Sequence, residues 1–248
     1  MICVEDKKIM KIIFLGTRGN IKVKTTRHER HTITIIEYKG VRVAIDCGLD
    51  WINHIKEIHA DAFVITHAHD DHIGGFEHGS PAPVYATQAT WQELGKCPIK
   101  ERVIVEYEKP FNIGALQWEA FFVEHSYWAF AVGYRITAGR KTIFCVHDLM
   151  KIKHQHKALE NVDMYIGDGA SFNRPIIRYK DGVPFGHTTI KNQIDWCKKM
   201  NIPRAIFTHC GSQIVKDTTL SVEEAVIRYG ELNGVETLVA YDGMTINV

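Results

Sequence analysis

Short apolar runs recur along the chain, most of them closed by a glycine or a polar residue. The first, KIIFLG, spans residues 11–16, and two β-branched runs follow at 31–38 and 41–48. Lys39-Gly40 separates these two runs, and its glycine has the backbone freedom that a tight turn requires, so the pattern predicts a hairpin. Further strands are predicted at 61–66, 83–86, 102–107, 116–125, 130–137, 142–148, 162–168, 204–210 and within 235–248.

Apolar residues at helical spacing occur between these runs. They predict helices at 51–59, 88–95, 189–200 and 221–230. Strands outnumber helices early in the chain and alternate with them later, which indicates an α/β protein with two packed sheets and helices on the outside. Since α/β enzymes of 248 residues commonly fold as one domain, and no repeat or linker is evident, we predict a single domain over residues 1–248.

Charge and cysteine content narrow the classes of function. The chain has 30 Lys+Arg against 29 Asp+Glu, a net charge of +1, so it lacks the strong field that captures nucleic acid or anionic membrane non-specifically. Its 6 cysteines are scattered without a C-x-x-C pair, which argues against a zinc ribbon or a redox dithiol. A reduced, intracellular setting is the simplest interpretation.

The beginning of the chain, MICVEDKKIMKIIFLG, has acidic and basic residues where a signal peptide needs its apolar run. No stretch approaches the roughly 20 apolar residues of a membrane span. We therefore expect a cytoplasmic protein without a membrane partner. Strand character begins directly after Met10, which makes Met10 a second candidate for the first residue of the protein. The sequence does not determine the oligomeric state, and a homodimer is compatible with it.

A cluster of polar residues follows the predicted strand at 61–66. Its sequence, T-H-A-H-D-D-H, contains His67, His69, Asp71 and His72. Because side chains alternate along an extended segment, His67 and His69 point the same way before the chain turns and presents the other two to a neighbouring position. Imidazole with carboxylate suits Zn²⁺ first and Mn²⁺ or Fe second, and the lack of thiolate favours an open, catalytic site.

Three further candidates close apolar strands elsewhere in the chain. His125 ends EAFFVEH, Asp148 ends TIFCVHD, and His209 ends RAIFTH. Ligand sites in α/β sheets collect at such strand ends. Each residue alone is equally compatible with an ordinary strand-end histidine or a helix-capping aspartate. Their coincidence with an intact H-x-H-x-D-H favours one shared site.

This combination resembles the metallo-β-lactamase superfamily. The segment EHSYWAFAVGYRITAGRKTIFCVHDL, residues 124–149, is similar to one shared by ribonuclease Z and the phosphoribosyl cyclic phosphate phosphodiesterase. VDMYIGDGAS, GHTTIKNQ, RAIFTHCGS and VAYDGMTI resemble other parts of that phosphodiesterase. The similarity covers almost the whole chain and is weak between 80 and 115. It implies a four-layer αββα sandwich, the metallo-β-lactamase fold.

The resemblance also implies a set of ligands for two divalent metal ions. One ion would be held by His67, His69 and His125, the second by Asp71, His72 and His209, with Asp148 bridging both. The chain departs from the family at His147-Asp148-Leu149, where Ser/Gly-Asp-Thr is usual. The cysteine cluster that adds a structural zinc to the cyclic phosphate enzyme is missing, as is the tRNA-gripping arm of ribonuclease Z, which argues against tRNA as substrate.

Two metals about 3.5–4 Å apart lower the pKa of a bridging water and clamp an in-line displacement. A phosphodiester also needs a proton donor and cations. The predicted catalytic residues are Asp71 and His187. His187 lies in F-G-H-T-T-I and matches a histidine of both relatives. The alternative interpretation is an ordinary histidine at the start of a helix that Thr188 caps.

Other polar residues are assigned supporting roles. Arg18, Arg30 and His31 in the first loop are predicted to bind substrate, although such charges often only solvate a loop. Asp168 ends another strand and is predicted to orient a ligand histidine, since metal-bound imidazoles need a partner for their second nitrogen.

The favoured function is therefore a metal-dependent phosphodiesterase that acts on a small cyclic or linear phosphodiester or on a nucleic acid end. A thioester or lactone hydrolase of the same fold is the alternative enzyme and needs neither His187 nor the arginines. The non-enzymatic alternative is a nucleic-acid-binding protein that retains the fold. The presence of all seven ligands argues against it, because degenerate members usually lose some.

Overall fold

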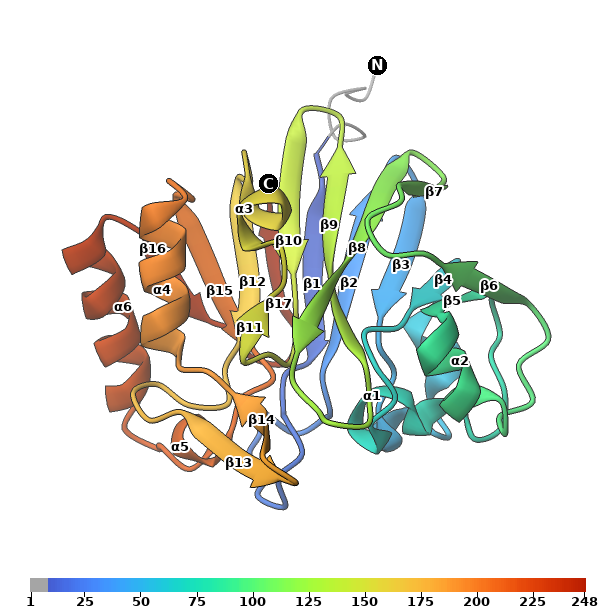
Figure 1. Ribbon diagram of the computed structural model, residues 1–248, viewed down its shortest axis with the longest axis horizontal. Helices are drawn as coiled ribbons and strands as arrows, with labels where there is room; N and C mark the ends of the chain where they lie inside the picture. Colours follow the sequence, from blue (N-terminus) through green and yellow to red (C-terminus); the bar gives the residue numbers. More distant parts are fainter. Residues whose placement is uncertain (1–8) are drawn as a thin grey trace.

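Two β-sheets pack face to face at the centre of the molecule (Figure 1). The computed structural model describes residues 9–248; the predictions made for the segment before residue 9 lie outside this range. In spatial order the first sheet consists of β17 (Met244–Asn247), β1 (Lys11–Gly16), β2 (Ile33–Tyr38), β3 (Val41–Ile45), β4 (Ala62–Val64), β5 (Val84–Thr87) and β6 (Arg102–Val105).

The second sheet takes up the middle and the later part of the chain. Its strands in spatial order are β11 (Lys151–Ile152), β8 (Leu116–Glu124), β9 (Ala131–Ala138), β10 (Lys141–Cys145), β12 (Met164–Asp168), β15 (Arg204–Thr208) and β16 (Glu236–Val239), and β7 (Phe111–Ile113) pairs with β8. The last strand, β17, leaves this region and pairs with β1, which ties the two ends of the described chain into the first sheet.

Helices cover the outer faces of both sheets, so the predicted four-layer αββα sandwich is confirmed (Figure 1). On the second sheet lie α4 (Ile190–Lys199) and α6 (Ser221–Asn233). Against the first sheet lie α2 (Gln88–Leu94) and the short turns η2 (Leu49–Trp51), η3 (Ile55–Ile58), α1 (Asp70–Ile73) and η4 (Gly74–Phe76). The remaining short helices are α3 (Gln155–Leu159) and α5 (Ser212–Val215).

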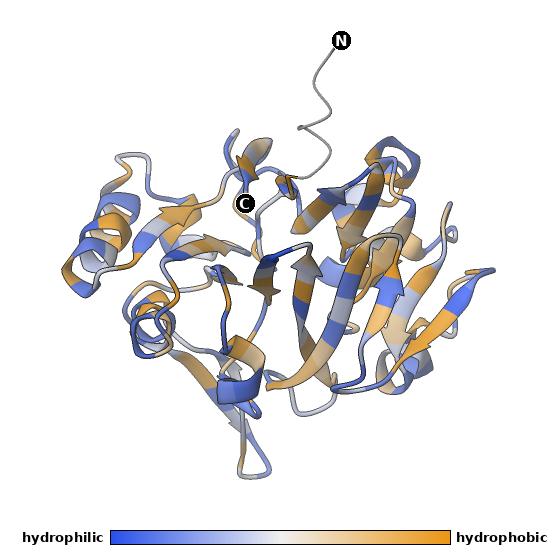
Figure 2. Ribbon diagram, turned by 90° about the horizontal axis from the view of Figure 1, so that it is seen from above, coloured by the Kyte–Doolittle hydropathy of each residue, from blue (hydrophilic) through white to orange (hydrophobic). Residues whose placement is uncertain are grey.

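Three apolar clusters lie between the four layers. Trp118 of β8 is fully buried between the two sheets, whereas Phe121 of the same strand points to the other face, where it packs against Phe144 and lies beneath Lys157 of α3. This alternation follows from the two-residue period of a strand that is buried on both faces. Figure 2 shows the result, with strands coloured mostly apolar and helices that alternate between polar and apolar residues. Phe63 belongs to the third cluster, beneath α2 and the turns.

The helix predicted at 51–59 is wrong in type. The segment forms the two 3₁₀ turns η2 and η3, in which Trp51 N–H donates to Gly48 and His54 N–H donates to Trp51, at 3.0 and 2.8 Å. Gly48 touches the backbone at Asp71, where an added Cβ would lie 2.1 Å from the carbonyl oxygen. This short connection between buried elements therefore forms i→i+3 backbone hydrogen bonds and not those of an α-helix.

A hairpin that the apolar pattern did not predict stands apart from both sheets. It consists of β13 (Ile176–Lys180) and β14 (Val183–His187), which pair only with each other. Asp181 and Gly182 form its turn with φ of 50° and 79°. Two positive φ values are those of a type I′ turn, for which Asp-Gly is a preferred sequence.

The strands that precede the polar residues end at one edge of the sandwich. β3, β4 and β5 are parallel to one another, as are β10, β12 and β15, and β8 runs in the direction of β10 because both are antiparallel to β9. In Figure 1 this is the lower edge, next to α1 and the β13–β14 hairpin. In the described part of the chain, no helix has the length and apolar content that a membrane span requires.

Candidate metal centre

All seven residues predicted as metal ligands meet at this edge. They form two groups of four in which the possible ligand atoms lie within 4.8 Å of one another, and Asp148 belongs to both groups. The first group is His67, His69, His125 and Asp148, and the second is Asp71, His72, Asp148 and His209. The groups combine residues from the loop after β4, from α1, and from the ends of β8, β10 and β15.

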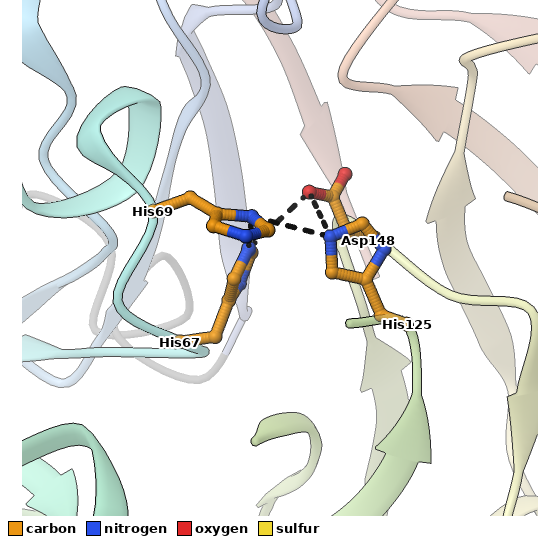
Figure 3. Close-up of side chains that lie close together, drawn as sticks. All are labelled: His67, His69, His125 and Asp148. Atoms are coloured by element: carbon orange, nitrogen blue, oxygen red, sulfur yellow. Dashed lines mark hydrogen bonds and ion pairs between the residues drawn. The ribbon is translucent and has the colours of Figure 1, made fainter. Parts of the chain in front are cut away.

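Figure 3 shows the first group, whose imidazoles and carboxylate converge. His67 Nε2 lies 2.8 Å from His69 Nδ1, and His125 Nε2 lies 3.3 Å from that same atom. Asp148 Oδ2 is 3.4 Å from His67 Nε2 and 3.3 Å from His125 Nε2. Ligand atoms arranged tetrahedrally around a zinc ion at its usual bond lengths would lie about 3.3–3.4 Å apart.

The second group approaches both oxygens of the Asp148 carboxylate. His72 Nε2 lies 3.1 Å from Asp148 Oδ2 and 3.4 Å from Asp71 Oδ2. His209 Nε2 lies 3.0 Å from Asp71 Oδ2, and its Nδ1 lies 2.6 Å from Asp148 Oδ1. The position of Asp148 between both groups is the position that a bridging ligand requires.

The hydrogen bonds of the histidines fit a bound divalent cation. Nδ1 of each of three imidazoles already has a partner: His67 on Thr66 Oγ1 at 3.0 Å, His125 on the Gly186 carbonyl at 3.0 Å, and His72 on Asp46. The Nε2 lone pairs of these rings are then directed into the groups, as in metal-binding histidines whose second nitrogen is held.

Two buried atoms in the centre support the same conclusion. Within residues 9–248, Asp148 Oδ1 and His209 Nδ1 have no hydrogen-bond partner, because their mutual approach lacks the required alignment. Buried polar atoms without partners are costly and rare, and a cation would satisfy both. Burial lowers the pKa of His67 to about 3, so its ring stays neutral, which is the form that binds metal.

Asp46, at the end of β3, supports the second group and was missed in the sequence. Its Oδ2 accepts hydrogen bonds from His72 Nδ1 at 2.8 Å, His147 Nδ1 at 2.6 Å and Thr66 Oγ1 at 2.7 Å. The residue is fully buried. The strand-end rule that found Asp148 would also have found Asp46, since it closes the apolar run VAI.

His147 accounts for the departure from the usual family sequence around Asp148. The side chain is fully buried, and Thr34 Oγ1 lies 3.0 Å from its Nε2. Because Nδ1 donates to Asp46, Nε2 is the acceptor for the Thr34 hydroxyl in the neutral ring. His147, which follows β10, thus connects the second sheet to Thr34 and Asp46 of the first sheet.

His187 lies beside both groups and lines the same cavity as they do. Its Nδ1 lies 2.7 Å from Asp168 Oδ2, which leaves Nε2 as the free ring nitrogen. Asp168 also accepts from the backbone N–H of Leu149 and Ala170, at 3.1 and 2.8 Å. The partner of Asp168 is therefore His187 and not a histidine of the two ligand groups, which differs from the prediction. Burial lowers the pKa of His187, but the Asp168 carboxylate outweighs this effect and the net direction is upward.

A cavity of about 670 Å³ opens over the two groups. This is within the usual size of small-molecule sites. Besides His187 and several possible ligands, its walls come from the hairpin, from Asp70, and from the four segments 19–21, 126–128, 170–171 and 211–213. These wall residues are Gly19, Asn20, Ile21, Asp70, Ser126, Tyr127, Trp128, Ala170, Ser171, Ile176, Arg178, Phe185, Gly186, Gly211, Ser212 and Gln213.

The structure does not place Arg18, Arg30 and His31 in this lining. The Arg18 guanidinium is buried, pairs with Asp50 and donates to backbone carbonyls. Arg30 lies 4.4 Å over the ring of Trp51, and His31 is held by Asp50. These side chains fasten the first loop to η2, and their binding of substrate stays a prediction.

His28 in the same loop leads us to predict that the folded protein loses stability in acid. His28 is buried, its Nδ1 bonds to Thr17 Oγ1 at 2.8 Å, and burial with the nearby Arg27 charge lowers its pKa from 6.5 to about 4. His28 then binds a proton more tightly in the unfolded chain than in the folded one. Its contribution to the free energy of unfolding is therefore fully present above pH 6.5 and declines toward pH 4. We expect about 2 kcal/mol to be lost from this group between pH 7 and 5.

Urea unfolding of the wild type and His28→Gln at these two pH values measures this effect. The difference between the two proteins removes every pH effect that they share, including that of the candidate metal centre. The loss between pH 7 and 5 should be smaller by about that amount in the variant. Equal losses would show that His28 carries a proton in the folded protein as readily as in the unfolded one.

Two packed sheets with histidines and aspartates gathered at one edge define the architecture of a metal-dependent hydrolase. A family model described as a beta-lactamase superfamily domain matches residues 41–210, and the chain belongs to this superfamily. This confirms the resemblance seen in the motifs. No curated protein matches the chain in sequence.

Solved structures of the same fold are similar over the whole chain. The metallo-beta-lactamase fold protein YhfI from Bacillus subtilis is 18% identical with a TM-score of 0.74, over 98% of this chain and 100% of that one. A diphosphatase from the PhnP family is 18% identical with a TM-score of 0.70, over 96% and 97%. A long-form RNase Z from yeast is 15% identical with a TM-score of 0.62, over 99% of this chain and 42% of the yeast chain.

Proposed function

We propose that the protein is a phosphodiesterase that hydrolyses small cyclic or linear phosphodiesters or the end of a nucleic acid. The observation that carries this proposal is His187, which lies beside both ligand groups and is held by Asp168. A proton donor in this place serves a reaction with a strongly basic leaving group, such as the alkoxide of a phosphodiester. A thiolate leaves without such help, so a thioesterase would have no use for it.

The two ligand groups would hold two divalent ions, Zn²⁺ first and Mn²⁺ or Fe second, with Asp148 shared between them. Such ions supply an activated water and positive charge for the phosphoryl oxygens. The Asp168 carboxylate raises the pKa of the His187 ring above its usual value, which favours the protonated form. The Nε2–H of His187 is placed to protonate the departing oxygen, and Asp168 stabilises the charged ring until then.

Two of the structural neighbours point in the same direction, since their names describe a diphosphatase and an RNase. The cavity of about 670 Å³ suits a small diester or a chain end better than a folded nucleic acid.

Purified protein loaded with Zn²⁺ tests the proposal against its alternatives. We expect turnover of bis-p-nitrophenyl phosphate and none of a panel of thioesters and lactones. Cleavage of a thioester or lactone without any phosphodiester turnover would overturn the proposal in favour of the other hydrolase. Absence of bound metal by elemental analysis, together with no turnover, would favour a binding protein that retains the fold.

A further inference from the structure

One wall of the cavity is apolar and partly exposed, next to the first ligand group. The Trp128 ring lies 4.8 Å from the ring of His69, edge to face, and the residue is still 45% exposed. Tyr127 beside it packs 5.1 Å from Phe185 of the hairpin. All of these side chains except His69 are large apolar groups whose exposure to water in a cavity is unfavourable. A ligand that covers them is the natural occupant.

One face of the β13–β14 hairpin forms the outer part of this wall. Alternation along the strands puts Ile176, Arg178, Phe185 and His187 on the same face, and Arg178 is the cross-strand partner of Phe185. Lys180 on this face donates to the Tyr127 hydroxyl at 3.0 Å and so joins the hairpin to the loop after β8. The wall therefore extends from the proton donor at the base of the hairpin toward its tip.

Arg178 adds a positive charge to this wall. Among the described residues it is the one arginine or lysine that lines the cavity. Its side chain is exposed, and no hydrogen bond or ion pair to any of residues 9–248 engages its guanidinium. Arg178 lies two cross-strand pairs beyond the pair of Ile176 and His187, which is about 7 Å farther along the hairpin. It is thus placed for a part of the ligand that lies away from the reacting phosphate.

We propose that this wall selects the substrate: a phosphodiester with one arm that carries a flat ring, which packs on Trp128, and a second anionic group, which pairs with Arg178. The inference rests on the phosphodiesterase function proposed above and names the substrate class for that site. Stacking on an aromatic ring and pairing of a guanidinium with an anion are the two interactions that these side chains provide best.

Binding of a graded ligand series by calorimetry tests the proposal on the Zn²⁺-loaded protein. The probes are 2-deoxyribose 5-phosphate, thymidine 5′-phosphate and thymidine 3′,5′-bisphosphate. We expect the ring to strengthen binding to the wild type about tenfold or more, and the second phosphate to add about as much again. Trp128→Ala should lose the first gain, and Arg178→Ala should lose the second.

Matched variants separate recognition from general effects on the surface. Phe130 belongs to the same loop as Trp128 and is 53% exposed, and Tyr179 neighbours Arg178 and is 71% exposed, yet neither lines the cavity. Phe130→Ala and Tyr179→Ala should keep both gains. Binding of the sugar phosphate, which lacks the ring, shows that each variant retains its phosphate site.

The outcomes distinguish failure of this inference from failure of the proposed function. If the wild type cleaves bis-p-nitrophenyl phosphate but binds all three probes equally, the inference alone is wrong. The same holds if Trp128→Ala and Phe130→Ala behave alike, or if Arg178→Ala weakens all three probes equally, which would place the guanidinium on the reacting phosphate. If the wild type cleaves no phosphodiester, the proposed function fails and the inference with it.

Discussion

Replacement of His187 by asparagine is expected to lower kcat for a dinucleoside phosphate by about 100- to 10,000-fold, the usual contribution of a general acid. The same variant should cleave bis-p-nitrophenyl phosphate at close to the wild-type rate, because p-nitrophenolate leaves without a proton. His187 is not one of the seven predicted ligands, although its ring also lies close to Asp148, Asp168 and His209. Since those seven residues complete both ligand groups, we expect the metal content to remain unchanged. Steady-state kinetics with the two esters, alongside elemental analysis, measure these effects.

The contrast between the esters is the informative part of this experiment. An equal loss with both esters would mean that His187 positions other groups and does not donate the proton. His154→Asn is a suitable control, because His154 lies on the exposed surface and pairs with Glu108. It should leave both rates unaltered.

Asp148→Ala is expected to have the largest effect on the metal centre. This carboxylate is shared by both ligand groups and is nearly fully buried. Its loss should reduce the metal content from two ions per chain to at most one and lower kcat for bis-p-nitrophenyl phosphate by at least about 1,000-fold, since several kcal/mol of transition-state stabilisation come from the paired ions. Elemental analysis of the dialysed protein and the same assay give both numbers.

A control for the loss of a carboxylate is available far from the centre. Asp195 on α4 is exposed and accepts a hydrogen bond from the Tyr229 hydroxyl at 2.9 Å. Asp195→Asn should keep both metal content and rate. Two ions retained in Asp148→Ala would contradict the bridging position and show that each group holds its ion without the shared carboxylate.

The candidate ligands could be located from the sequence because two local rules apply to them. H-x-H-x-D-H is contiguous, and the others close apolar strands whose ends meet at one edge of the sandwich. The fold followed from the same strands and from the family resemblance. These features depend on short-range patterns, which a single sequence displays.

Residues whose role depends on tertiary contacts were harder to assign. Arg18 stands in a basic loop, and only the folded chain shows that Asp50 on the η2 turn pairs with its guanidinium. The hairpin with Arg178 was missed because its first strand is exposed on both faces and so has no apolar period, although Asp181-Gly182 is a turn signal. Exposure hides an element from an analysis based on burial.

The attachment of the hairpin has a consequence for how this enzyme family could acquire new specificities. At the base, Gly186 N–H donates to the His125 carbonyl at 2.7 Å, and the Gly186 carbonyl accepts from His125 Nδ1. His187, the proposed proton donor, and the candidate ligand His125 are therefore held close to each other through the backbone of Gly186. The tip, from Arg178 to Pro184, takes no part in these two hydrogen bonds and lies outside both sheets. Insertions or substitutions at the tip can change which molecules enter without moving the reacting groups, so substrate range and chemistry can evolve separately in this chain.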